Sequence, residues 1–107
     1  MKEPARLVPA IYSWNLAVVQ KAANVCGYAI AVHGSMSRDF DLVAVPWVED
    51  ATSADDLVMC ICASMELTVQ SGDPVDKPHG RLSYTLKMDG DRFIDLCVMR
   101  RHSDGQT

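Results

Sequence analysis

The sequence predicts an α+β domain whose elements follow the order helix, strand, strand, helix, strand, strand. Two segments carry apolar residues at spacings of three and four, which is typical of helices that cover a core. Two other regions each contain a pair of short apolar runs separated by turn-forming residues, which is typical of hairpins. We therefore expect a four-stranded, mainly antiparallel sheet with both helices on one face. Because 107 residues suffice for one core, we expect a single domain over 1–107, with an N-terminal segment at 1–8 and a flexible tail at 102–107.

The first helix is expected over residues 9–26, and the first pair of strands follows it. One apolar stripe at helical spacing consists of Ile11, Trp14, Val18, Ala22 and Val25. Pro9 suits the first helical turn, and Gly27 stands where a C-terminal cap is expected. The apolar runs 29–32 and 40–45 then form a hairpin with a polar tip between them.

The tip of this hairpin carries candidate ligands for a metal ion and for phosphate. Asp39 and Asp41 are two residues apart on a strand, so both carboxylates project to one side, about 6 to 7 Å apart. Such a pair can hold a hard cation, and Mg²⁺ is typically bound by one or two carboxylates together with substrate phosphates. Gly34 and Ser35 offer backbone N–H groups and a hydroxyl to a phosphate.

The second helix begins near Thr52 or Ser53, either of which can cap it with an aspartate at the third position. Its apolar stripe consists of Leu57, Ile61 and Met65. Residues 71–80 are rich in turn formers and are predicted to be a loop. Three cationic or potentially cationic side chains occur at alternate positions there and just beyond, namely Lys77, His79 and Arg81. They form either a solvated connection or a phosphate clamp.

The second hairpin joins residues 82–88 to 93–99 through a two-residue turn at Asp89-Gly90. That loop length sets a register with Leu86 opposite Phe93, Tyr84 opposite Asp95 and Leu82 opposite Cys97. Asp95 stands in an otherwise apolar strand, where a buried carboxylate is unfavourable unless it is paired or binds a metal. If the two hairpins share one sheet with adjacent central strands, Asp95 joins Asp39 and Asp41 on one face.

Composition and charge narrow the class of protein. No apolar run approaches the roughly 20 residues that span a bilayer, and residues 2–4 do not begin a signal peptide, so we expect a cytoplasmic protein. The net charge of −4 argues against bulk nucleic-acid binding, but residues 77–107 carry six basic and four acidic side chains, so this part could face an anion. The four cysteines lie in apolar segments without a C-x-x-C pair and are expected to be buried free thiols.

Two resemblances follow from these residues. The turn Gly34-Ser35, the D-x-D-L strand at 39–42 and the downstream Asp95 resemble the DNA polymerase β-like nucleotidyltransferase superfamily, particularly its minimal members. The resemblance implies that the three acids bind Mg²⁺ ions, that the Gly-Ser turn holds a triphosphate, and that the reaction is two-metal nucleotidyl transfer. Only residues 36–38 separate Ser35 from Asp39, which is fewer than that family usually has and leaves little room for a triphosphate.

The stretch HGSMSRDFDLVAVPW, with KPHG later in the chain, is also similar to small proteins encoded by bacteriophages and prophages. This likeness implies a compact protein in the host cytoplasm that acts on host nucleotide signalling. One such action is the sequestration of a cyclic nucleotide made by an antiviral system.

Three functions remain open at this point. The first is a non-catalytic nucleotide-binding protein, in which a base stacks on Trp47 or Tyr84 and the phosphates meet Arg38, Lys77, His79 and Arg81. The second is a minimal Mg²⁺-dependent nucleotidyltransferase. The third is a ligand-free protein–protein interaction module, in which Arg38 pairs with Asp39 or Asp41 and Asp95 bonds to Tyr84. An exposed sheet face or edge also favours a homo-oligomer.

Overall fold

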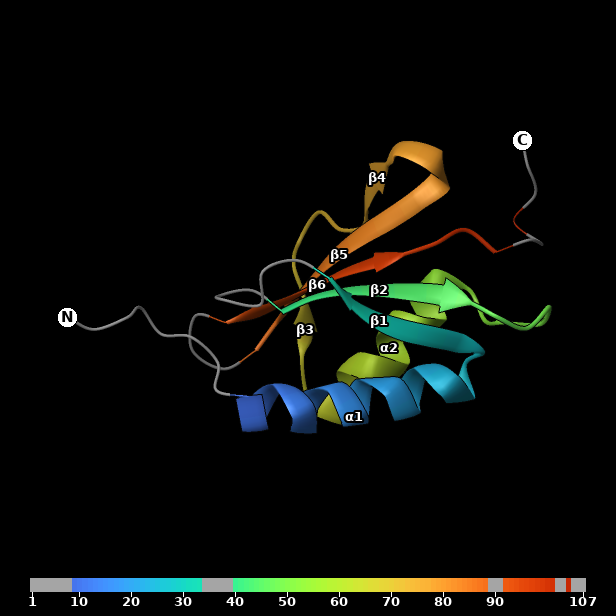
Figure 1. Ribbon diagram of the computed structural model, residues 1–107. Helices are drawn as coiled ribbons and strands as arrows, with labels where there is room; N and C mark the ends of the chain where they lie inside the picture. The colour runs from blue at the N-terminus through green and yellow to red at the C-terminus, as the bar shows by residue number, and fades with distance from the viewer. Residues whose placement is uncertain (1–8, 34–39, 89–91, 102–103, 105–107) are drawn as a thin grey trace.

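The computed structural model describes residues 9–33, 40–88, 92–101 and 104, and this part of the chain is an α+β fold with two α-helices and a mixed sheet of six strands (Figure 1). The elements are α1 (Pro9–Val25), β1 (Tyr28–His33), β2 (Phe40–Pro46), α2 (Ala54–Met65), β3 (Thr68–Val69), β4 (Val75–Lys77), the 3-10 helix η1 (Pro78–Gly80), β5 (Arg81–Lys87) and β6 (Phe93–Val98). The strand order is β1-β2-β6-β5-β3, and β4 also pairs with β5. The predicted α+β class is confirmed, and four of the five described strand pairings are antiparallel, but the sheet is mixed and has six strands where four were predicted. β2 and β6 run parallel, and β3 and β4 enlarge the sheet.

One core fills the space between the helices and one face of the sheet. The central strands bury alternate residues, namely Phe40, Leu42, Ala44, Ile94, Leu96 and Val98. The helices contribute Val19, Ala22, Ala23, Leu57, Val58 and Ile61 to the same cluster. The intervening strand residues point to the opposite side, which we call the open face because neither described helix covers it (Figure 1). The open face carries the candidate site.

Helix α1 is placed as predicted but is rotated about its axis. Val25 is 80% exposed, whereas Asn15 and Val19, which lie outside the predicted stripe, are buried. Ile11 and Trp14 belong to the first helical turns, whose side chains lie outside the described part. Gly27 follows the helix with φ +91°, a conformation that favours glycine, so the predicted cap is confirmed.

Helix α2 agrees closely with its sequence signals. The Ser53 side chain accepts a hydrogen bond from the Asp56 N–H at 3.1 Å, so Ser53 is the N-cap and Asp56 is the third helical residue. Leu57 and Ile61 are fully buried, and Met65 packs at the margin of the core. Neither helix of the described chain is long and apolar enough to cross a membrane.

The register between β5 and β6 differs from the prediction by one residue. Tyr84 pairs with Leu96, and Asp95 pairs with Thr85. The Met88 N–H donates to the Arg92 carbonyl at 3.0 Å, so three residues connect the strands where two were predicted. Because a slip of one residue exchanges the faces of a strand, this longer connection decides that Asp95 and Tyr84 lie on opposite sides of the sheet. The predicted turn residues Asp89 and Gly90 lie outside the described part.

The segment 71–80, predicted to be a loop, contains β4 and η1. β3 and β4 each pair with one half of the outer edge of β5, and the chain between them bridges the gap. The Gln70 N–H donates to the Thr85 carbonyl at 2.9 Å, and the Thr85 N–H donates to Asp73 Oδ2 at 2.6 Å. The Asp73 carboxylate thus replaces a strand at this position.

Asp73→Ala is expected to lower the free energy of unfolding by about 1–3 kcal/mol, because the half-buried Thr85 N–H loses its acceptor. Asp76→Ala removes the same charge from an exposed position on β4 and should change stability by less than about 0.5 kcal/mol. Urea denaturation of both variants and the wild type makes the comparison. Equal stability of Asp73→Ala and the wild type would show that the carboxylate does not hold this edge.

The chain beyond β6 is anchored at Arg101. Its Nη1 donates to the Ala51 carbonyl at 3.1 Å, and its Nη2 lies 2.6 Å from Asp104 Oδ1. Asp104 is the one residue of the predicted flexible tail, 102–107, that the structure describes. The rest of 102–107 lies outside the described part.

Candidate functional site

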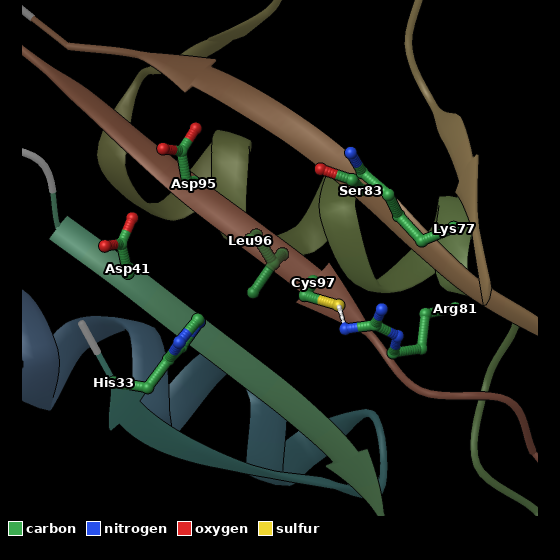
Figure 2. Close-up of a pocket in the computed structure, with 8 residues that line it drawn as sticks. All are labelled: His33, Asp41, Lys77, Arg81, Ser83, Asp95, Leu96 and Cys97. Atoms are coloured by element: carbon green, nitrogen blue, oxygen red, sulfur yellow. Dashed lines mark hydrogen bonds between the residues drawn. The ribbon is translucent and has the colours of Figure 1, made fainter. Parts of the chain in front are cut away.

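A cavity of about 440 Å³ opens on the open face (Figure 2). It is lined by His33, Asp41, Lys77, Arg81, Ser83, Asp95, Leu96 and Cys97. These residues come from five strands, so the cavity lies across the sheet and does not belong to a single loop. Its volume is in the range of about 300–1,000 Å³ that is typical of small-molecule sites.

The acidic half of the cavity consists of Asp41 and Asp95. The parallel register of β2 and β6 makes them direct partners, and their carboxylates point to the same side (Figure 2). Because neighbouring strands lie about 4.8 Å apart, the two groups can share one ligand. His33 pairs with Asp41 from β1, which continues the row across three strands. The structure thus brings together Asp41 and Asp95, while their catalytic and metal-binding roles stay predictions.

The donor set of this half suits Mg²⁺, although the described residues contain no group of three His, Cys, Asp or Glu side chains placed to hold a metal. Mg²⁺ keeps several waters and often takes only one or two carboxylates, with phosphate oxygens completing its shell. Asp41 and Asp95 could supply those two carboxylates. Asp39, the third predicted ligand, lies outside the described part.

The basic half consists of Lys77 and Arg81, which are partners across β4 and β5 on either side of η1. Arg81 Nε donates to the Pro78 carbonyl at 3.0 Å, and Arg81 Nη1 donates to Cys97 Sγ at 3.7 Å. These two bonds hold the guanidinium over β6, two residues beyond Asp95 (Figure 2). Two residues along a strand span about 7 Å, so a ligand group has room between the opposite charges.

Two predicted ligand residues lie away from the cavity. His79 has φ +69° within η1, and its side chain is exposed outside the cavity lining. The turn η1 interrupts the alternation of side chains that a continuous strand would have. His79 is therefore not placed beside Lys77 and Arg81, although the three residues occur at alternate positions in the sequence. Trp47 follows the other end of β2 and is 65% exposed. It lies six residues beyond Asp41, a distance of about 20 Å along a strand.

Tyr84 lies on the core side of the sheet and is 2% exposed. Its Oη donates to Asp55 Oδ1 at 2.7 Å, which ties β5 to the first turn of α2. Burial first, and then this hydrogen bond, raise the pKa of Tyr84 well above its ordinary value, so the hydroxyl stays protonated. Tyr84 therefore cannot stack on a base in the cavity, and its predicted hydrogen bond with Asp95 is wrong.

Four further predicted residues, Gly34, Ser35, Arg38 and Asp39, lie outside the described part, and their roles stay predictions. Sequence reasoning missed four residues of the cavity lining, namely His33, Ser83, Leu96 and Cys97. Ser83 and Cys97 lie two residues beyond Arg81 and Asp95 on the same strands, so strand alternation would have found them. All four cysteines are free thiols as expected, but only Cys26 is buried, whereas Cys60, Cys62 and Cys97 are half-buried.

The chemistry available on the open face is therefore a pair of carboxylates and a pair of cations at opposite ends of one cavity, with Ser83, Leu96 and Cys97 between them. The sequence matches no protein-family model and no curated protein.

Proposed function

We propose that the protein binds a nucleotide in the open-face cavity, with its phosphates on Lys77 and Arg81. The pairing of these two cations at one end of a ligand-sized cavity carries the proposal. Guanidinium and ammonium groups bind phosphate through charge-assisted hydrogen bonds, and arginine does so in a bidentate manner. Within the described residues neither cation forms an ion pair. Both therefore have donors to offer to an anion.

The biological role that we infer is sequestration. Similarity to small phage and prophage proteins favours a protein that captures a linear or cyclic nucleotide signal of host antiviral defence. Capture requires affinity but no turnover, so it tolerates the short connection between Ser35 and Asp39. Neither Trp47 nor Tyr84 belongs to the described cavity lining, so the proposal assigns recognition to the phosphate groups.

One observation favours a second candidate function, minimal Mg²⁺-dependent nucleotidyl transfer. Asp41 and Asp95 are direct partners on adjacent parallel strands, as the nucleotidyltransferase resemblance requires of two of its three acids. These two carboxylates would hold the metal, with Asp39 as the third acid. A bound Mg²⁺ would neutralise charge on the phosphates, while Lys77 and Arg81 orient them.

Native mass spectrometry of the protein purified from cells tests both functions. The protein is measured alone and with a panel of linear and cyclic nucleotides, each with and without Mg²⁺. A retained nucleotide of unchanged mass supports sequestration, and conversion of a triphosphate or transfer of a nucleotidyl group supports catalysis. An apo mass under every condition would overturn both proposals and favour the interaction module.

A further inference from the structure

Two thiols meet where helix α1 ends beside helix α2. Cys26 directly follows α1, Cys60 lies in the middle of α2, and the two helices pack against each other (Figure 1). Cys60 Sγ donates to the Ala22 carbonyl at 3.9 Å. Ala22 lies one helical turn before Cys26, on the same side of the helix. The Cys26 thiol is itself hydrogen-bonded to the Cys60 thiol, so the two sulfur atoms are in contact.

The two thiols differ in their access to solvent. Cys26 is 7% exposed, its carbonyl accepts a hydrogen bond from the Thr52 N–H at 2.9 Å, and its thiol is hydrogen-bonded to the Thr52 side chain. Burial raises the pKa of Cys26, which lowers the fraction of reactive thiolate. Cys60 is half-buried. A small oxidant from solvent therefore reaches Cys60 first.

The other two cysteines are placed differently. All four cysteines belong to the described part of the chain, and each is a free thiol. Cys62 is two residues beyond Cys60 on α2, and residues at this spacing do not face each other on a helix. Cys97 lies on β6 and lines the open-face cavity. Cys26 and Cys60 are therefore the pair whose thiols are placed to react with each other.

We propose that Cys26 and Cys60 form a reversible disulfide when the protein meets hydrogen peroxide. The Cys60 thiol gives up its proton and its sulfur attacks one oxygen atom of the peroxide, so that the O–O bond breaks, water leaves and Cys60 becomes a sulfenic acid. The Cys26 thiol then gives up its proton and its sulfur attacks the Cys60 sulfur. The S–S bond forms, the S–O bond breaks, and a second water leaves. Two thiols and one peroxide thus give one disulfide and two waters, with two electrons passing from sulfur to the peroxide.

The contact between the thiols favours the disulfide over further oxidation of Cys60. Groups that are held together react as if at a very high local concentration. The sulfenic acid at Cys60 forms with the Cys26 sulfur already beside it. Because the sulfur atoms are in contact in the reduced protein, the bond needs little movement of the two helices. A dithiol reductant reverses the reaction by thiol–disulfide exchange.

The disulfide joins the end of α1 to α2 and closes the segment 27–59. This segment contains β1 and β2, which supply His33 and Asp41 to the cavity. A disulfide stabilises a protein mainly by restricting the unfolded chain. Oxidation is therefore expected to stabilise the part of the fold that carries these two residues. In compartments that keep thiols reduced, such bonds are usually transient and serve as redox sensors.

Mass spectrometry of the peroxide-treated protein tests the proposal. The folded wild type is treated with a small excess of hydrogen peroxide, and the remaining thiols are then alkylated. The expected product is a single chain that has lost the mass of two hydrogen atoms before alkylation and yields a cross-linked Cys26–Cys60 peptide on digestion. Its thermal unfolding midpoint should rise by several degrees and return to the starting value with dithiothreitol. Cys62→Ala is the matched control and should show both changes.

Variants at the pair separate the two steps of the reaction. Cys60→Ala should lose both the cross-link and the thermal shift. In Cys26→Ala the sulfenic acid at Cys60 has no thiol beside it, so dimedone should trap it, whereas the wild type should give little adduct. Circular dichroism checks that each variant folds, and the wild-type result does not depend on either of them. Absence of the Cys26–Cys60 cross-link in the treated wild type would overturn the proposal, and so would a cross-link that maps to Cys62, to Cys97 or to a second chain.

Discussion

Replacing Arg81 by alanine is expected to weaken nucleotide binding by about 10- to 150-fold. The Arg81 guanidinium lies over Cys97 on β6. Among the described residues that line the cavity, it is the strongest phosphate-binding group. A hydrogen bond to a charged group contributes about 1.5–3 kcal/mol, and 1.4 kcal/mol corresponds to a tenfold change in affinity. Isothermal titration calorimetry with the nucleotide retained by the wild type measures this loss.

The matched control is Lys87→Ala. Lys87 is an exposed cation at the other end of the same strand and lies outside the cavity lining, so its removal changes the net charge equally. The affinity of Lys87→Ala for the nucleotide should stay within about twofold of the wild type, because salt screens the interaction between an exposed charge and a ligand at the far end of the strand. Arg81→Lys retains the charge but loses the planar fork, and its affinity should fall between the two. Equal affinity of Arg81→Ala and Lys87→Ala would place the phosphates elsewhere.

Local signals in the sequence predict much of this fold. The cap at Gly27, the N-cap at Ser53 and the buried stripe of α2 each depend on residues close together in the chain, and each is confirmed. The proximity of Asp41 and Asp95 could also be inferred, because each is the polar exception in an apolar run. The prediction depended on the two hairpins sharing one sheet with adjacent central strands, and the pairing of β2 with β6 meets that condition.

The features that sequence reasoning missed depend on small differences in backbone geometry. A third residue in the connection after Met88 shifts the β5–β6 register by one, which moves Tyr84 from the expected cavity to the core. β4 is only three residues long and lies among turn-forming residues, so the composition of this segment does not indicate a strand. Its pairing with β5 nevertheless positions Lys77 beside Arg81. Lys77 and Arg81 were predicted to act together because they occur at alternate positions in the sequence. Their proximity instead results from the pairing of two antiparallel strands.

Asp41→Asn is expected to raise the affinity for metal-free nucleotide by about 3- to 50-fold. A phosphate held by Arg81 lies about 7 Å from the acidic pair by strand geometry. At that separation, a carboxylate repels a unit negative charge by about 0.6 kcal/mol at a dielectric constant of 80 and by about 2.4 kcal/mol at 20. Asparagine keeps the shape of the side chain and removes this repulsion. The exposed Asp50→Asn, which lies outside the cavity, should leave the affinity unchanged.

Adding Mg²⁺ is expected to reverse the order of nucleotide affinity, so that the wild type binds more tightly than Asp41→Asn. The wild type should gain affinity because the ion neutralises the two carboxylates and bridges them to phosphate. Asp41→Asn should gain much less, and any nucleotidyl transfer seen in the wild type should disappear. Calorimetry with and without Mg²⁺, together with a turnover assay, separates these effects. A lower metal-free affinity of Asp41→Asn would contradict the repulsion argument. The carboxylate would then accept a hydrogen bond from the ligand itself, so the nucleotide would have to present a donor, such as a ribose hydroxyl, to the acidic pair.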